Sequence, residues 1–280
     1  MKTLLVYSEL SGFAIQIKNH IYDAMEELSL EVRECYIDDV QKVSDEFQPT
    51  MHVFLHHANK LYEKKDIIKG LKGHKLLWTM EDPYESDVTF DMLDAFYYIF
   101  TSDEGTANEL KQLGSNHVEY VPHACDPKTH KPLEVSYEYK SDILFVGNAY
   151  ESRLKWFTDH ADEYKSKMVT IIGVGYRGLD LPGSRIIHGH INEEEMVKYI
   201  NGSKLVLNLH RQNSDLDMAN KRNIEASSLN NRFYEVAACG KQQLIVGRGK
   251  DNLVTGIPEK FHSEDSYKER LKKYYLPLLK

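Results

Sequence analysis

A carboxylate and a guanidinium stand three residues apart in the segment 230–246, which the residue pattern predicts to be a helix followed by a buried strand. Arg232 and Glu235 therefore share one side of the first helical turn, because residues at i and i+3 are neighbours on a helix surface. A carboxylate fixed there could accept hydrogen bonds from a vicinal diol such as a ribose, and the arginine could hold phosphate. The same spacing also fits an ion pair on a solvated helix face.

The pattern around this pair predicts where the helix and the strand lie. Phe233, Val236 and Ala237 recur at i, i+3 and i+4, which is typical of one apolar helix face. Gly240 stands where a glycine ends a helix by adopting the left-handed conformation. The three apolar residues 244–246 then predict a short buried strand.

The composition indicates a globular protein. The chain has 280 residues, 41% of them hydrophobic and 28% charged, so it can bury a sizeable core or two domains. The net charge of −8 argues against general affinity for nucleic acids or anionic membranes. Three scattered cysteines without a CxxC pair fit a reducing cytoplasm and argue against structural zinc. The apolar runs fall far short of the ~20 residues of a membrane span, and the N-terminal residues lack the apolar region of a signal peptide.

Strands and helices alternate along both halves of the chain. Residues 1–125 predict a doubly wound α/β domain whose apolar strands include 2–7, 51–57, 75–80, 96–101 and 118–123. Residues 126–139 contain two prolines and little apolar content, so they are interpreted as a linker. A second α/β domain is expected at 140–262. The basic amphipathic segment 263–280 could pack back on the first domain as a helix.

One glycine motif and one serine are interpreted as structural features. Residues 173–178 match GxGxxG, but the pattern after them does not continue as a helix, so we discount a dinucleotide site. Ser102 is expected to cap the helix after the fifth strand.

Polar residues follow several of the predicted strands, at the end of the sheet where parallel sheets bind ligands. They are His56, His57, Glu81, Asp82 and His123.

Several sequence blocks together resemble one known family. In the second half they are residues 142–148 followed by Arg153, residues 188–208, and the Arg-x-x-Glu-x-x-x-x-Gly block within 231–240. Residues 78–83 and 120–127 add to the likeness in the first half. The chain therefore resembles the glycosyltransferase-like domain of the CgeB/YkvP spore-protein family, which is related to group 1 glycosyltransferases of GT-B fold.

The resemblance implies an α/β protein with two Rossmann-like domains facing across a cleft, the GT-B arrangement. The C-terminal domain would hold a nucleotide-diphosphate-sugar as substrate and the N-terminal domain an unknown acceptor, with no cofactor and no bound metal. Glu235 would bind the ribose hydroxyls, and Arg232 would lie near the phosphates or the sugar. Gly147 and Asn148 would line the diphosphate loop, with Arg153 adding charge.

Further residues are assigned to the two halves of the site. Asn208, within the second block, and the cations Lys221 and Arg222 are placed with the donor-binding residues, because a departing nucleoside diphosphate needs positive charge. If the reaction inverts configuration, it needs an acceptor-side base, and Asp82 and His123 are the candidates. The alternatives are a turn begun by Asp82-Pro83 and a structural histidine.

Other interpretations remain open. Ser227 stands where many retaining relatives have a glutamate, which leaves sugar contact and stereochemistry open and favours a non-catalytic nucleotide-sugar binder. Asp215-Leu216-Asp217 matches the DxD triplet of metal-dependent GT-A enzymes. A nucleotide sensor or a phage-borne interaction protein would bind its ligand without turnover. The sequence leaves the sugar, the nucleotide, the acceptor and the oligomeric state undetermined.

Overall fold

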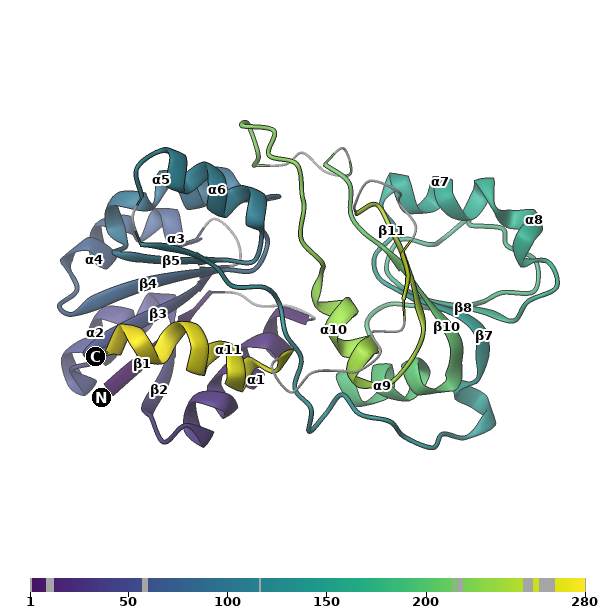
Figure 1. Ribbon diagram of the computed structural model, residues 1–280, viewed down its shortest axis with the longest axis horizontal. Coiled ribbons are helices and arrows are strands. Elements are labelled where there is room, and N and C mark those ends of the chain that lie inside the picture. The colour runs from purple at the N-terminus through teal and green to yellow at the C-terminus, as the bar shows by residue number, and fades with distance from the viewer. Residues whose placement is uncertain are drawn as a thin grey trace. The chain divides into compact units, whose positions relative to one another are not determined.

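The computed structural model describes residues 2–8, 13–56, 60–115, 117–213, 215, 219–248, 254–256 and 265–279. The chain divides into two compact units (Figure 1). The first unit comprises Met1–His123, Met218–Ser228 and Ser266–Lys280, and the second comprises Ala124–Asp217 and Leu229–Asp265. Two segments that are distant in sequence therefore complete the first unit. One of them, residues 218–228, falls within the range 140–262 that the sequence analysis assigned to the second domain.

The first unit is built on a six-stranded parallel sheet in the order β2-β1-β3-β4-β5-β6. Its strands are β1 Lys2–Tyr7, β2 Glu31–Tyr36, β3 Met51–His56, β4 His74–Thr79, β5 Tyr98–Thr101 and β6 Val118–Tyr120. The inner strands β1 and β3 carry unbroken runs of buried residues, which is the pattern of parallel strands covered on both faces.

Helices connect these strands. They are α1 Phe13–Glu27, α2 Val40–Phe47, α3 Lys60–Glu63, α4 Lys65–Gly70, α5 Ser86–Asp91 and α6 Glu104–Gln112. The prediction that Ser102 caps α6 is wrong by one residue. Asp103 has the extended backbone of a cap, and its Oδ2 accepts a hydrogen bond from the Thr106 amide at 2.9 Å.

The C-terminal segment belongs to the first unit. It consists of α11 Tyr267–Arg270, the π-helical turn η5 Leu271–Tyr275 and the 3₁₀ turn η6 Leu276–Leu279 (Figure 1, yellow). The Tyr275 hydroxyl lies 2.7 Å from Thr3 Oγ1 in the interior, and Lys268 pairs with Glu27 at 2.9 Å. A buried hydrogen bond to β1 and an ion pair to α1 thus hold this segment.

The second unit has a six-stranded sheet in the order β12-β11-β10-β7-β8-β9. Its strands are β7 Ser141–Val146, β8 Val169–Gly173, β9 Arg185–His188, β10 Ser203–Leu209, β11 Gln243–Val246 and β12 Val254–Gly256. All pairs are parallel except β11–β12. The helices are α7 Glu151–Asp159, α8 Ala161–Tyr164, α9 Glu193–Gly202 and α10 Asn231–Ala238.

Helix α10 begins and ends as its sequence predicts. The side chain of Asn230 accepts a hydrogen bond from the Phe233 amide. Gly240 has φ +67°, the Lys241 amide donates to the Val236 carbonyl, and the Gly240 amide donates to the Ala237 carbonyl. These two bonds define a Schellman motif, which favours glycine at this position because of its left-handed backbone.

None of the helices in the described part of the chain is long and apolar enough to cross a membrane.

Candidate functional site

The carboxyl ends of β7, β10 and β11 meet at one edge of the second unit's sheet, because these strands are parallel neighbours. A buried amide network fixes the start of α10 to this edge. Asn208, near the end of β10, exchanges hydrogen bonds of 3.1 and 2.9 Å with Asn230, the N-cap of α10. Asn208 also donates to Gln243 on β11. Asn208 is therefore a positioning residue for the helix that carries Arg232 and Glu235.

Arg153 joins two loops at the same edge. Its Nε and Nη2 donate to the Leu209 carbonyl at 3.1 and 2.8 Å, and its Nη1 donates to the Asn148 carbonyl at 2.9 Å. The guanidinium also lies over the Phe145 and Tyr150 rings. Burial lowers the pKa of Arg153 from its usual value. Arg153 thus uses its donors on backbone carbonyls and holds the end of β10 to the loop after β7.

Gly147 and Gly173 allow the loops after β7 and β8 to approach closely. A Cβ on Gly173 would lie 2.1 Å from the Gly147 carbonyl oxygen, and one on Gly147 would lie 3.0 Å from Arg153 Nη1. The Tyr176 hydroxyl donates to the same Gly147 carbonyl at 3.0 Å. The predicted diphosphate loop is therefore shaped by glycine–backbone contact, and Asn148 lies exposed beside it.

Arg232 and Glu235 form a buried ion pair on the first turns of α10. Arg232 Nη1 lies 2.5 Å from Glu235 Oε2, and Asn231 Nδ2 donates to Glu235 Oε1 at 2.7 Å. Arg232 Nη1 also contacts the Met196 sulfur. The two side chains are 14% and 7% exposed, so the solvated-face alternative is wrong. Each carboxylate oxygen has additional lone-pair capacity with which it could accept a ligand hydroxyl.

Two arginines at this edge were not among the predicted donor residues. Arg211 follows β10 and lies over the Tyr150 ring at 5.6 Å, and Arg248 follows β11 and donates to the Arg211 carbonyl at 3.2 Å. The signal in the sequence was a cation one or two residues past an apolar strand, because parallel strands bring such positions together. Arg211 and Arg248 add positive charge at this edge of the sheet.

The DxD triplet supplies a helix cap. Asp215 accepts hydrogen bonds from the Ser152 amide at 3.0 Å, from Ser152 Oγ at 2.6 Å and from the Gln212 amide at 2.7 Å. Its carboxylate thus satisfies the first turn of α7, where a negative charge is favoured. Leu216 and Asp217 lie outside the described residues.

In the first unit, Asp82 follows β4 and is enclosed by hydroxyls. Thr79 and Thr101 donate to its Oδ2 at 2.5 and 2.8 Å, and Thr89 donates to its Oδ1 at 3.0 Å. Burial raises the pKa of Asp82 to about 6, and the three hydrogen bonds lower it only in part. The peptide bond between Asp82 and Pro83 is cis.

Four other polar residues were predicted at the ends of the first unit's strands. His123 and Glu81 are buried, with 8% and 9% of their surfaces exposed. His56 is the last residue of β3, and His57 lies outside the described residues. The structure thus brings Asp82, Glu81 and His123 to the carboxyl ends of β4 and β6 in one unit.

The segment 218–228 carries three predicted residues into the first unit. The Lys221 amide donates to Asp87 at 2.9 Å, and Arg222 pairs with Glu109 at 3.3 Å while lying over the Phe90 ring. The Ser227 amide and hydroxyl donate to Asp103, the cap of α6. Lys221 and Arg222 are therefore engaged by acidic residues of the first unit.

Comparison with known structures identifies the fold. The chain superposes on an α-glucosyltransferase solved in complex with UDP and a 13-mer DNA with a central A:G mismatch, with a TM-score of 0.63, 13% identity, and coverage of 99% of this chain and 91% of that one. It also matches AviGT4, a glycosyltransferase involved in avilamycin A biosynthesis (TM-score 0.61, 11% identity, 98% and 93% covered). The UDP-GlcNAc 2-epimerase of Methanocaldococcus jannaschii matches with a TM-score of 0.55, 10% identity, and 98% and 99% coverage.

These likenesses and the two sheets define a two-domain, Rossmann-like GT-B fold. Residues 152–268 match the family described as glycosyl transferase-like. The chain is 28% identical over 189 residues to the spore protein CgeB of Bacillus subtilis, a match that covers 64% of this chain and 59% of that protein. Both matches support the resemblance to a CgeB-like, glycosyltransferase-like family that the sequence blocks predicted. The GT-B fold also disfavours the GT-A alternative.

Proposed function

We propose that this chain transfers a sugar from a nucleotide-diphosphate-sugar to an acceptor. The observation that carries the proposal is the buried Arg232–Glu235 pair at the start of α10, fixed to the carboxyl edge of the sheet through Asn230 and Asn208. A buried ion pair is usually no more stabilising than an apolar pair of similar volume. Its presence beside the carboxyl edge of the sheet is therefore better explained by ligand recognition than by stability.

The donor would be held by its ribose and its phosphates. Glu235 would accept hydrogen bonds from the vicinal hydroxyls of the ribose, a use that its two oxygens permit beside their present partners. Arg232, Arg211 and Arg248 would face the diphosphate together with the N-terminus of α10, which carries a partial positive charge. Fixed positive charge stabilises the nucleoside diphosphate as it departs, so the proposed reaction needs no bound metal.

UDP is the nucleotide to test first, because structural neighbours contain it in their described complexes. An acceptor-side base would act from the first unit. The two candidates for this base are Asp82, whose oxygens both accept from threonine hydroxyls, and His123. We place the reaction in the cytoplasm, because Cys35, Cys125 and Cys239 are free and buried.

A second candidate is a protein that binds a nucleotide-sugar without turning it over. The observation that favours it is Ser227, which stands where retaining relatives have a glutamate. Its amide and hydroxyl are both committed to Asp103 of the first unit. This arrangement leaves the position without a carboxylate for the sugar. The chain also spans only 59% of the curated relative that it matches, so the activity of that whole protein is a separate question.

The experiment is donor hydrolysis and transfer by the full chain with UDP-sugars, with and without a strong chelator. We expect UDP release that survives chelation and that is lost in Glu235→Ala. UDP binding without release, lost in the same variant, would instead establish the non-catalytic binder. Release that requires a divalent metal would contradict the metal-independent mechanism.

A further inference from the structure

A cavity lies at the edge of the second unit's sheet that is opposite to the proposed donor site. It has a volume of about 730 Å³, within the range of about 300–1,000 Å³ typical of small-molecule sites. Ser141 and Ser203, the first residues of β7 and β10, line it together with Met168, which precedes β8. These are strand starts, whereas α10 and Arg153 lie at the strand ends. The cavity is therefore distinct from the proposed donor site.

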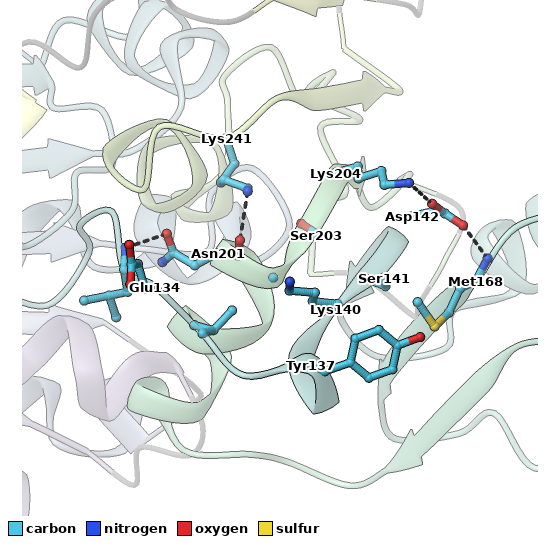
Figure 2. Close-up of a pocket in the computed structure, with 13 residues that line it drawn as sticks. Glu134, Tyr137, Lys140, Ser141, Asp142, Met168, Asn201, Ser203, Lys204 and Lys241 are labelled. Atoms are coloured by element: carbon cyan, nitrogen blue, oxygen red, sulfur yellow. Dashed lines mark hydrogen bonds and ion pairs between the residues drawn. The ribbon is translucent and has the colours of Figure 1, made fainter.

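The linker forms the wall of this cavity, and its position is fixed. Asn201 at the end of α9 donates to the Lys131 carbonyl at 3.0 Å and accepts from the Leu133 amide at 2.9 Å. A Cβ on Gly202 would lie 2.2 Å from the Tyr139 carbonyl oxygen, so only glycine allows this approach. Figure 2 shows the side chains of Tyr137 and Lys140 from this segment beside Ser141 and Ser203.

The charges around the cavity select the ligand. Lys204 pairs with Asp142 at 2.7 Å, and Asp142 also accepts from the Met168 amide (Figure 2), which lowers the pKa of Asp142. Lys241 donates to the Asn201 carbonyl at 2.8 Å, and Lys140 has no ion pair within the described residues. The lining contains three lysines, which are Lys140, Lys204 and Lys241, and two acidic residues, so its net charge is +1. One phosphate monoester suits this balance better than a diphosphate.

Two further groups favour a sugar attached to that phosphate. Tyr137 is 77% exposed, so its ring offers an open face to the apolar side of a sugar ring. Ser141 is 2% exposed, and its Oγ has no hydrogen-bond partner among the described residues. Buried hydroxyls are normally satisfied. A ligand hydroxyl would supply the missing partner after Ser141 rotates to another staggered rotamer.

We propose that this cavity binds a small sugar phosphate, with Lys140 and Lys241 on the phosphate, Tyr137 against the sugar ring and Ser141 on a sugar hydroxyl. The site is independent of the proposed transfer reaction, because no residue of the donor-side network lines it.

Calorimetric titration of glucose 6-phosphate into the full chain tests the proposal. We expect the wild type to bind glucose 6-phosphate with a Kd below about 10 mM. The Kd should rise about tenfold in Lys140→Met and about threefold in Ser141→Ala, because each variant removes one polar contact to the ligand. Lys155→Met is the matched control, since Lys155 is an exposed lysine on α7 that pairs with Asp159 and does not line the cavity. Its affinity should equal that of the wild type. UDP affinity should be unchanged in Lys140→Met, which separates this site from the donor site.

Ser141→Ala also gives a reading that needs no ligand. Because Oγ makes no hydrogen bond to the described residues, its removal should leave the thermal unfolding temperature unchanged or raise it. Three results would overturn the proposal: absence of binding up to about 10 mM, equal affinity in wild type and Lys140→Met, or binding of inorganic phosphate as tight as that of glucose 6-phosphate.

Discussion

Two buried carboxyl groups, one in each unit, have different partners. Glu235 of the second unit accepts from a guanidinium and an amide, both on its own helix. Among the described residues, Asp82 of the first unit accepts from three threonine hydroxyls, and burial raises its pKa to about 6. The second unit therefore holds a charge in place by pairing it, whereas the first unit holds a carboxyl group that takes up a proton at about pH 6.

Breaking the charged pair should have the largest effect. Glu235→Ala leaves the Arg232 guanidinium buried without its carboxylate, which typically costs about 3–5 kcal/mol of unfolding free energy. Chemical denaturation measures this loss. The double variant Arg232→Met, Glu235→Leu replaces both charges by apolar groups and should recover most of the stability without recovering UDP binding. A double variant as unstable as the single one would contradict the view that the unpaired charge is the cause.

Asp82 should make stability depend on pH with the opposite sign to that of a paired carboxylate. Its pKa rises from 3.8 to about 6 on folding, so its contribution is fully present below about 3.8 and is lost as pH rises through about 6. The shift of about two units corresponds to about 3 kcal/mol. Between pH 7 and pH 4, the wild type should gain up to this amount relative to Asp82→Asn. If the unfolding free energies of the two proteins depended on pH in the same way, Asp82 would not take up this proton.

The amide network should matter less for stability and more for ligand binding. Asn208→Ala removes the hydrogen bonds that Asn208 makes to Asn230 and Gln243, which should cost about 1–3 kcal/mol. It should also weaken UDP binding, because the start of α10 is no longer fixed to β10. Asn192→Ala removes the simple cap of α9, costs about 1 kcal/mol and should leave UDP affinity unchanged. Equal loss of UDP affinity in both variants would exclude a specific positioning role for Asn208.

The smallest effect is expected at the segment bound to the first unit. Arg222 and Glu109 are 42% and 35% exposed, so Arg222→Ala should change the unfolding free energy by about 1 kcal/mol or less. If Lys221 and Arg222 do not contact the donor, the double alanine variant should bind UDP as the wild type does. A tenfold or larger loss of affinity would show that they bind the donor, as the sequence predicts.

The parts of the fold that local pattern encodes were predictable. The apolar run of β1, the i, i+3 placement of Arg232 and Glu235, and the glycine that ends α10 are written in neighbouring residues. The burial of the ion pair was not, because it depends on Met196 of a distant helix.

Long-range partners account for what the sequence did not reveal. Asp215 caps a helix about 60 residues earlier in the chain, and Ser227 binds Asp103 of the first unit. Arg248 reaches the donor-side edge only because β11 lies beside β10. Such pairings are set by strand order and by loops that cross between units, and neither leaves a periodic signal in the sequence.

Titration of UDP into wild type and Glu235→Gln tests the central claim most directly, because glutamine keeps the shape of the side chain and removes its charge. The account predicts that the wild type binds and that the variant binds at least about tenfold more weakly, with the folded state verified by thermal unfolding. Equal affinity of the two proteins for UDP would contradict it.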